Sequence, residues 1–232
     1  MNAIRAGLLL GLLLASAGAR GEDVAGTLQG GLGAVWREPS DAPPYDQLKL
    51  EYDTGTLAWI EAANRYDYGL LLRASYEYAY FDRLTALGTL TILEDLQQHD
   101  ARLGAFWAPW SRGPLDARIG AGYVFIEGSS RSGSSKDHAS QDGGFAEAGL
   151  AWHVTRSVSL DAALSGFKVD GDENFDAEGV ELALAASFRA GALDLIVGAR
   201  YGKGQHENFA DEEVLELRVG LGGAWGWIEN RP

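Results

Sequence analysis

The acidic segment DGDENFD, residues 170–176, has residue types and a spacing that could bind a metal ion. Its candidate ligands stand at alternate positions, as at the start of a calcium-binding loop: Asp170, Asp172, Asn174 and Asp176. The sixth position of such a loop needs glycine, but the chain has Phe175 there. We therefore expect an acidic, solvated loop and no cofactor, with weak calcium or magnesium binding as the alternative.

Three of the four histidines have an acidic neighbour, which could suit metal binding or hydrolysis. These neighbouring pairs are His99–Asp100, Asp137–His138 and His206–Glu207. The fourth histidine, His153, stands apart from them. Four histidines scattered over a chain of this length are ordinary surface residues in most proteins, so we expect the chain not to be an enzyme.

A larger set of charged residues alternates with apolar residues along the chain. Its members are Asp67, Arg73, Glu77, Arg102, Asp116, Arg118, Glu147, Asp161, Glu181, Arg189, Asp194, Arg200, Glu216 and Arg218. Buried charges are costly unless they are paired. The set could therefore form an interior network of ion pairs, or it could line a charged pore. The elements that carry these residues decide between the two.

Those elements have the period of two that is typical of β-strands. In residues 66–80, one face is aromatic and aliphatic, whereas the other carries Asp67, Arg73 and Glu77. The pattern predicts ten strands, at about residues 26–37, 46–61, 66–81, 97–108, 115–127, 144–154, 157–168, 178–189, 193–202 and 213–227.

The connections between the predicted strands alternate in length. The short ones are ANRYD, PWSRGP, TRS and RAGA, and the others are long and polar. One of the long ones, GSSRSGSSKDHASQDGG, is rich in glycine and serine, and we expect it to be a mobile loop. Short turns at one end and long loops at the other are typical of an outer-membrane barrel with its turns in the periplasm.

Aromatic residues are expected to form two belts. Strands that run toward the short turns end in Trp59, Trp107, Trp152, Phe188 and Trp225. Strands that run toward the long loops end in Trp36, Tyr80, Phe125, Phe167 and Tyr201. Amphipathic rings at both interfaces suit a barrel that faces lipid, whereas a soluble sandwich has no reason to sort its aromatics in this way.

The first residues and the composition agree with export. Arg5, the apolar residues 6–14 and small residues near position 17 are typical of a secretory signal peptide at 1–19, which leaves 20–232 for the barrel. The absence of cysteine excludes disulfides and thiolate metal sites. The net charge of -14 argues against nucleic acid as a partner.

With its leader, strand pattern, belts and terminal segment VLELRVGLGGAWGW, the chain resembles the small outer-membrane β-barrels of Gram-negative bacteria, such as OmpA and OmpX. The resemblance implies a closed antiparallel transmembrane β-barrel in the cell outer membrane, reached through the periplasm. It also implies contact with outer-membrane lipid and lipopolysaccharide, and insertion by the barrel assembly machinery. Those proteins have eight strands, which is the alternative to our ten, and they commonly end on an aromatic residue, whereas IENRP follows Trp227 here.

A barrel of eight strands is just wide enough for side chains to fill, and ten strands add little room. We therefore expect a filled, salt-bridged lumen and a structural or surface-interaction role. A small narrow channel or porin is the alternative, and measured conductance would distinguish the two. An enzyme at the rim is the third class, but the Asp-x-His pattern of omptin proteases is absent and no His and Ser pair suits a lipid A deacylase. The sequence does not define an oligomeric state.

Overall fold

The computed structural model describes residues 24–39, 50–52, 54–66, 68–86, 91–112, 114–132, 135–171, 176–206 and 212–225. These residues form eleven strands. They are β1 (Val24–Pro39), β2 (Leu50–Tyr52), β3 (Gly55–Tyr66), β4 (Leu70–Ala86), β5 (Thr91–Arg112), β6 (Leu115–Ser132), β7 (Ser135–Thr155), β8 (Val158–Gly171), β9 (Ala177–Ala190), β10 (Leu193–His206) and β11 (Glu212–Trp225). Over these ranges, no helix is long and apolar enough to cross a membrane. The expected signal peptide, residues 1–19, lies outside them.

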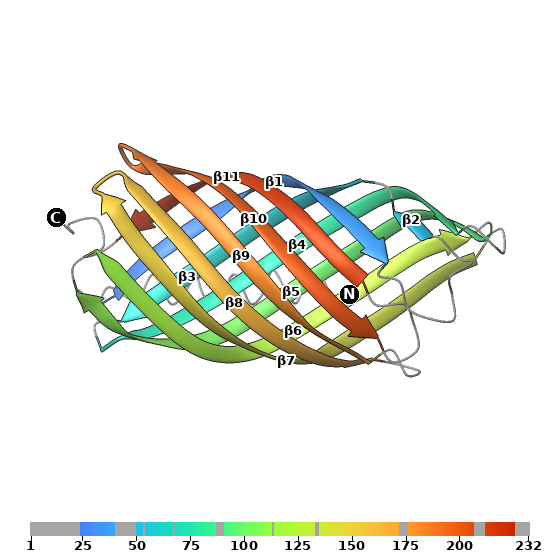
Figure 1. Ribbon diagram of the computed structural model, residues 1–232, viewed down its shortest axis with the longest axis horizontal. Coiled ribbons are helices and arrows are strands. Elements are labelled where there is room, and N and C mark those ends of the chain that lie inside the picture. The colour runs from blue at the N-terminus through green and yellow to red at the C-terminus, as the bar shows by residue number, and fades with distance from the viewer. Residues whose placement is uncertain are drawn as a thin grey trace.

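Ten long strands close into an antiparallel barrel, and the short β2 pairs beside β4 (Figure 1). Around the ring the order is β1, β3, β4, β5, β6, β7, β8, β9, β10 and β11, and β11 pairs with β1 again. Closure leaves no free sheet edge around the barrel, which is what a sheet in lipid requires. The predicted ten-stranded barrel is confirmed, and the eight-stranded alternative is wrong.

The alternation of residues places the apolar side chains on the outside. Leu32 is 71% exposed and Leu164 is 59% exposed, and most of the large hydrophobic residues of β6 to β11 also face outward. In water such a surface would be strongly unfavourable, whereas hydrocarbon accommodates it. The barrel is therefore inverted relative to a soluble protein, because its polar residues face the lumen.

Close backbone contact at the closing seam depends on glycine. A Cβ atom at Gly31 of β1 would lie 2.0 Å from the carbonyl oxygen of Val219 on β11. Because that oxygen belongs to the backbone of the paired strand, no side-chain rotation could relieve the clash. The sequence GGLG in β1 thus permits the first and last strands to approach.

The first short turn, which joins β3 to β4, differs from the prediction. The turn expected at ANRYD lies later in the chain, because β3 continues to Tyr66 and β4 begins at Leu70. Gly69 has a φ of 89°, a left-handed conformation that glycine adopts readily, and its N–H donates to the carbonyl of Tyr66 at 3.0 Å. The strand expected at about 46–61 is therefore replaced by the short β2 and the later β3.

The prediction that the whole segment GSSRSGSSKDHASQDGG is a mobile loop is wrong. Strands β6 and β7 continue their ladder through it, from Phe125 opposite Asp142 to Ser132 opposite Ser135. Strands β4 and β5 are also long, so β4 to β7 project beyond the ends of β8 to β11 on the right of Figure 1. Such a hairpin cannot be predicted from its weak local periodicity, because pairing between neighbouring strands stabilises it.

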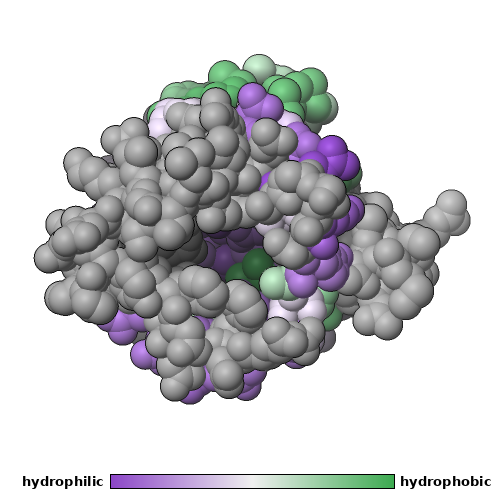
Figure 2. All heavy atoms as spheres, turned by 90° about the vertical axis from the view of Figure 1, so that its right-hand side faces the viewer, coloured by the Kyte–Doolittle hydropathy of each residue, from purple (hydrophilic) through white to green (hydrophobic). Residues whose placement is uncertain are grey.

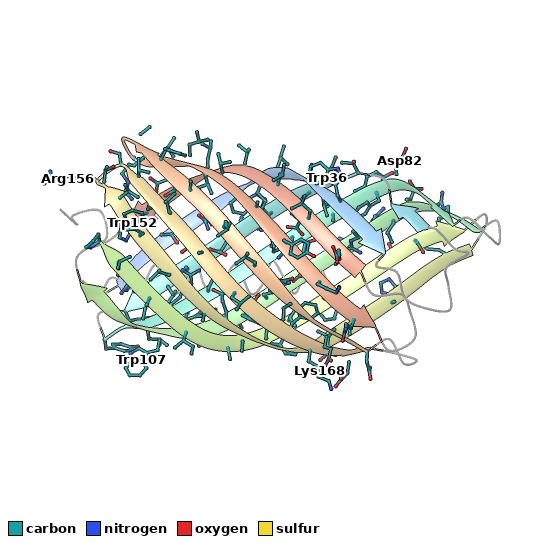
Figure 3. All side chains as sticks on the ribbon, in the orientation of Figure 1. Trp36, Asp82, Trp107, Trp152, Arg156 and Lys168 are labelled. Atoms are coloured by element: carbon teal, nitrogen blue, oxygen red, sulfur yellow. The ribbon has the colours of Figure 1, made fainter. Side chains whose placement is uncertain are left out.

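The aromatic belts are confirmed only in part. Trp107 and Trp152 lie exposed on the outer surface at the short-turn end, as Figure 3 shows. Trp59, in contrast, is only 8% exposed and packs inside the barrel, so its assignment to the belt is wrong. Phe167 also packs against a buried interior cluster. The side chain of Trp225 lies outside the described residues.

Candidate functional site: the charged lumen

Viewed from the long-loop end, the barrel is hollowed, and both hydrophilic and hydrophobic residues are visible in the hollow (Figure 2). The predicted inward residues that the structure describes come from β4 to β11, whereas Asp67 lies outside the described residues. The others take part in ion pairs inside the barrel. They form distinct groups along the lumen.

The first group is centred on Arg102 of β5. Its guanidinium nitrogens lie 2.5 and 2.8 Å from the two carboxylate oxygens of Glu181 on β9. They also contact Asp100, two residues earlier on β5, at 2.8 Å. Because β5 and β9 are four strands apart around the ring of ten, this pair reaches across the bore.

The second group joins β10 and β11 to β4. Arg200 lies 2.5 Å from one Glu77 oxygen and 2.6 Å from Glu216. Arg218 contacts both carboxylates, with 2.9 Å to Glu77. Strands β10 and β4 are also four apart around the ring, so Arg200 and Glu77 form a second bridge across the bore.

The third group links β4, β6, β7 and β8. Glu147 accepts from Arg73 at 2.9 Å and from Arg118 at 3.1 Å. Arg118 also donates to both oxygens of Asp161, at 2.6 and 2.9 Å. The Arg73 guanidinium lies over the Phe106 ring at 4.5 Å from its centroid, which adds a cation–π contact.

A fourth group lies near the short turns. Arg65 contacts Asp116 at 3.3 Å, and His153 contacts the same carboxylate at 3.2 Å. Arg189 and Asp194 pair at 3.1 Å between the adjacent strands β9 and β10. The Arg189–Asp194 pair is more accessible to water than the bridges across the bore, since the Arg189 side chain is 38% exposed.

The middle groups are largely removed from water. Glu216, Glu147 and Glu77 are buried, and the side chain of Arg102 is only 12% exposed. Carboxylates and guanidinium groups in such surroundings need well-formed partners, and two-pronged contacts supply them. The geometry therefore cross-links distant strands rather than leaving charges free along an open pore.

Sequence reasoning missed three charged members and one polar member of the lumen. Asp100 shares the parity of Arg102, so the alternation alone could have found it. Glu61, which accepts from the Gln29 amide at 2.8 Å, and Arg65 could be found only with the correct end of β3. Because the turn was predicted too early in the chain, the inward-facing residues near the end of β3 could not be identified.

Two cavities remain between the ion pairs. One of ≈ 370 Å³ lies in the middle of the lumen and is lined by Trp59, Arg102 and Arg118 among others. A second of ≈ 770 Å³ lies at the short-turn end and is lined by Arg65, His153 and other polar residues. The cavities adjoin, because both are lined by Thr27, Gln29, Ser159, Ser187 and Ile196.

The predicted metal residues are only partly described. Asp172 and Asn174 lie outside the described residues. Asp170 is exposed, and Asp176 accepts from the Gly171 backbone N–H at 3.3 Å. Within the described part of the chain, no group of three or more histidine, cysteine or acidic side chains is arranged to hold a metal ion.

The histidines are distributed over both ends of the barrel. His99 contacts the Tyr76 hydroxyl at 2.6 Å, and His138 lies 3.0 Å from Glu127, both toward the long-loop end. His153 lies at the short-turn end, and the side chain of His206 is outside the described residues.

No protein-family model matches the chain, and no curated protein is similar to it in sequence. Among solved structures, it is similar to the outer-membrane protease OmpT from Escherichia coli, with 12% identity, a TM-score of 0.51, and coverage of 88% of this chain and 97% of that one. It is also similar to the β domain of the Bordetella autotransporter BrkA, with 12% identity, a TM-score of 0.55, and coverage of 88% and 100%. At such identities the likeness concerns the fold alone: this chain has the architecture of the Gram-negative outer-membrane β-barrels.

Proposed function

We propose that this chain is an outer-membrane β-barrel whose lumen is closed to ions and whose role is structural or surface interaction. The observation that carries the proposal is the pair of bridges across the bore, Arg102 with Glu181 and Arg200 with Glu77. Each bridge joins strands four positions apart in a ring of ten. An ion that crossed the lumen would have to separate these buried pairs, and separating them is costly.

The placement in the membrane is part of the same proposal. The outward apolar surface would contact outer-membrane lipid, with lipopolysaccharide around the long-loop end, and the barrel assembly machinery would insert the chain after export. Trp107 and Trp152 would then mark the periplasmic interface, because indole rings favour that depth. The short turns would face the periplasm and the projecting strands would face the exterior.

The sheet of β4 to β7 that projects beyond the rest of the rim is the best candidate for surface interaction. Its β6–β7 hairpin is polar, with Arg131, Lys136 and His138 exposed. Over the described ranges, residues 135–139 of β7 pair only with β6, since β8 joins β7 from Gln141 onward. An exposed strand edge in water offers backbone groups to a partner.

An ion-flux assay tests the closed lumen. Wild-type barrel in lipid vesicles should not dissipate a potassium gradient, whereas the double variant Arg102→Ala with Arg200→Ala should leak, because it removes both bridges. The double variant Arg189→Ala with Arg131→Ala serves as a control, since it removes two arginines outside the middle groups. Rapid flux through the wild type would contradict the proposal.

A narrow channel is the second candidate, and the two adjoining cavities favour it. Together they extend from the short-turn end to the middle of the lumen, where the bridges begin. If this candidate were correct, wild-type flux would be measurable, and the Arg102→Ala and Arg200→Ala changes would shift the ion selectivity rather than create the leak. We propose no enzymatic role.

A further inference from the structure

The middle cavity of the lumen has the features of a binding site rather than those of a packing gap. On one wall, Trp59 of β3 extends over β1 as far as β11. A Cβ atom at Gly220 of β11 would lie only 2.6 Å from Cζ2 of the indole, so the absence of a side chain at Gly220 leaves room for the ring. Trp59 also packs with Ile196 of β10. The two side chains form an apolar platform inside an otherwise polar lumen.

The opposite wall carries small side chains. Ala163 of β8 and Ala183 of β9 are directly paired in register, and both line the cavity. Strands β3 and β9 are four apart around the ring, so these alanines face the Trp59 platform across the bore. Their size leaves the space of ≈ 370 Å³ open, and pockets for small molecules begin at about 300 Å³.

The charge of the lining indicates what kind of molecule fits. Five arginines line the cavity, and five carboxylates line it with them. These groups pair with one another and with Asp100 and Glu216, so no arginine of the lining is left free to attract an anion. Hydroxyl groups of Ser159, Ser165 and Ser187 complete the polar part of the wall. An aromatic platform surrounded by hydroxyls and paired charges suits a neutral molecule with several hydroxyl groups.

One buried polar atom agrees with this interpretation. The indole Nε1–H of Trp59 is buried and has no hydrogen-bond partner among the described residues. Buried donors without partners are uncommon, because the lost hydrogen bond to water is not replaced. An acceptor oxygen on a bound molecule would satisfy it.

We propose that the lumen binds a small neutral polyol of monosaccharide size between Trp59 and the alanines of β8 and β9. The molecule enters from the short-turn end through the adjoining cavity of ≈ 770 Å³, since the bridges across the bore close the other direction. This site depends on the barrel and its cavities, not on the structural or surface role proposed above.

Calorimetric titration of the detergent-folded full chain with D-glucose tests the proposal, with gluconate as a charged analogue of similar size. We expect heat of binding for glucose at concentrations up to about 10 mM, and at least tenfold weaker binding of gluconate. Ala183→Leu should abolish binding by filling the cavity. The matched control is Ala186→Leu, the same change on the outward face of β9, and it should leave binding intact.

Two further variants keep the test decisive. If Ala183→Leu does not fold, Ala163→Val reduces the same space by less and should still weaken binding. Trp59→Phe keeps an aromatic ring but removes the N–H, and should weaken binding about fivefold. The proposal is overturned if glucose gives no heat, if gluconate binds equally well, or if binding persists in Ala183→Leu and Ala163→Val. Unchanged affinity in Trp59→Phe would show that the indole N–H makes no hydrogen bond to the bound molecule.

Discussion

Replacing Arg102 by leucine should destabilise the barrel strongly. The guanidinium is 12% exposed and contacts both Asp100 and Glu181. Without it, two largely buried carboxylates remain without their cation. Breaking a buried ion pair by removing one partner costs about 3–5 kcal/mol, because the remaining charge is left uncompensated.

The control is Arg189→Leu, which makes the same chemical change in a different environment. Arg189 is 38% exposed and pairs with Asp194 on the adjacent strand, where water solvates both partners. Exposed pairs of this kind contribute up to about 1 kcal/mol. The two variants should therefore differ by at least about 2 kcal/mol in the free energy of unfolding.

Urea unfolding of the barrel in lipid vesicles, followed by tryptophan fluorescence, measures this difference. A double variant, Arg102→Leu with Glu181→Leu, completes the test, because it removes both charges of the bridge. It should recover part of the lost stability, since only Asp100 is then left without its arginine. If Arg102→Leu is no more destabilising than Arg189→Leu, the middle of the lumen is hydrated and the bridges do not close it.

Three further predictions concern the outer wall, the closing seam and the projecting hairpin. Leu164→Arg places a charge on the lipid-facing surface and should lower the free energy of unfolding in vesicles by about 2–4 kcal/mol. If the variant is as stable as the wild type, Leu164 does not lie in the hydrocarbon. Gly31→Val should abolish the fast-migrating form on unheated denaturing gels, because its side chain would clash with Val219 of the paired strand; a normal folded band would contradict the closing contact. Arg131 and Lys136 lie directly opposite each other on β6 and β7, so Lys136→Glu should stabilise the hairpin by about 0.2–1 kcal/mol, measured as slower hydrogen exchange there, and faster exchange would refute that pairing.

The sequence predicted the features that depend on alternation over many residues. Period-two patterns in β8 to β11 define strands whose inward and outward faces match the structure, and the inward positions of Asp161, Glu181 and Arg200 follow from parity. Closure into a ring also follows, since a strand with one lipid-facing side cannot leave an edge unpaired.

Features that depend on exact register were not predictable in the same way. The residues of ANRYD favour turns locally, yet pairing with β1 carries β3 through them to Tyr66. A shift in the position of the turn changes the height and facing expected for every residue near it. For this reason the sequence predicts, wrongly, that Trp59 belongs to the lipid-facing belt. Partners across the bore, such as Arg102 and Glu181, depend on strand tilt and the stagger of the whole barrel, which no local pattern encodes.

Single-channel recording in a planar lipid bilayer tests the closed lumen most directly. Purified wild-type barrel, folded and inserted at low protein density, should give no stepwise current over a wide range of voltage. The double variant Arg102→Ala with Arg200→Ala should give discrete openings in the same bilayers, which shows that insertion occurred. Steady, reproducible channels from the wild type would contradict the account and identify the protein as a narrow pore.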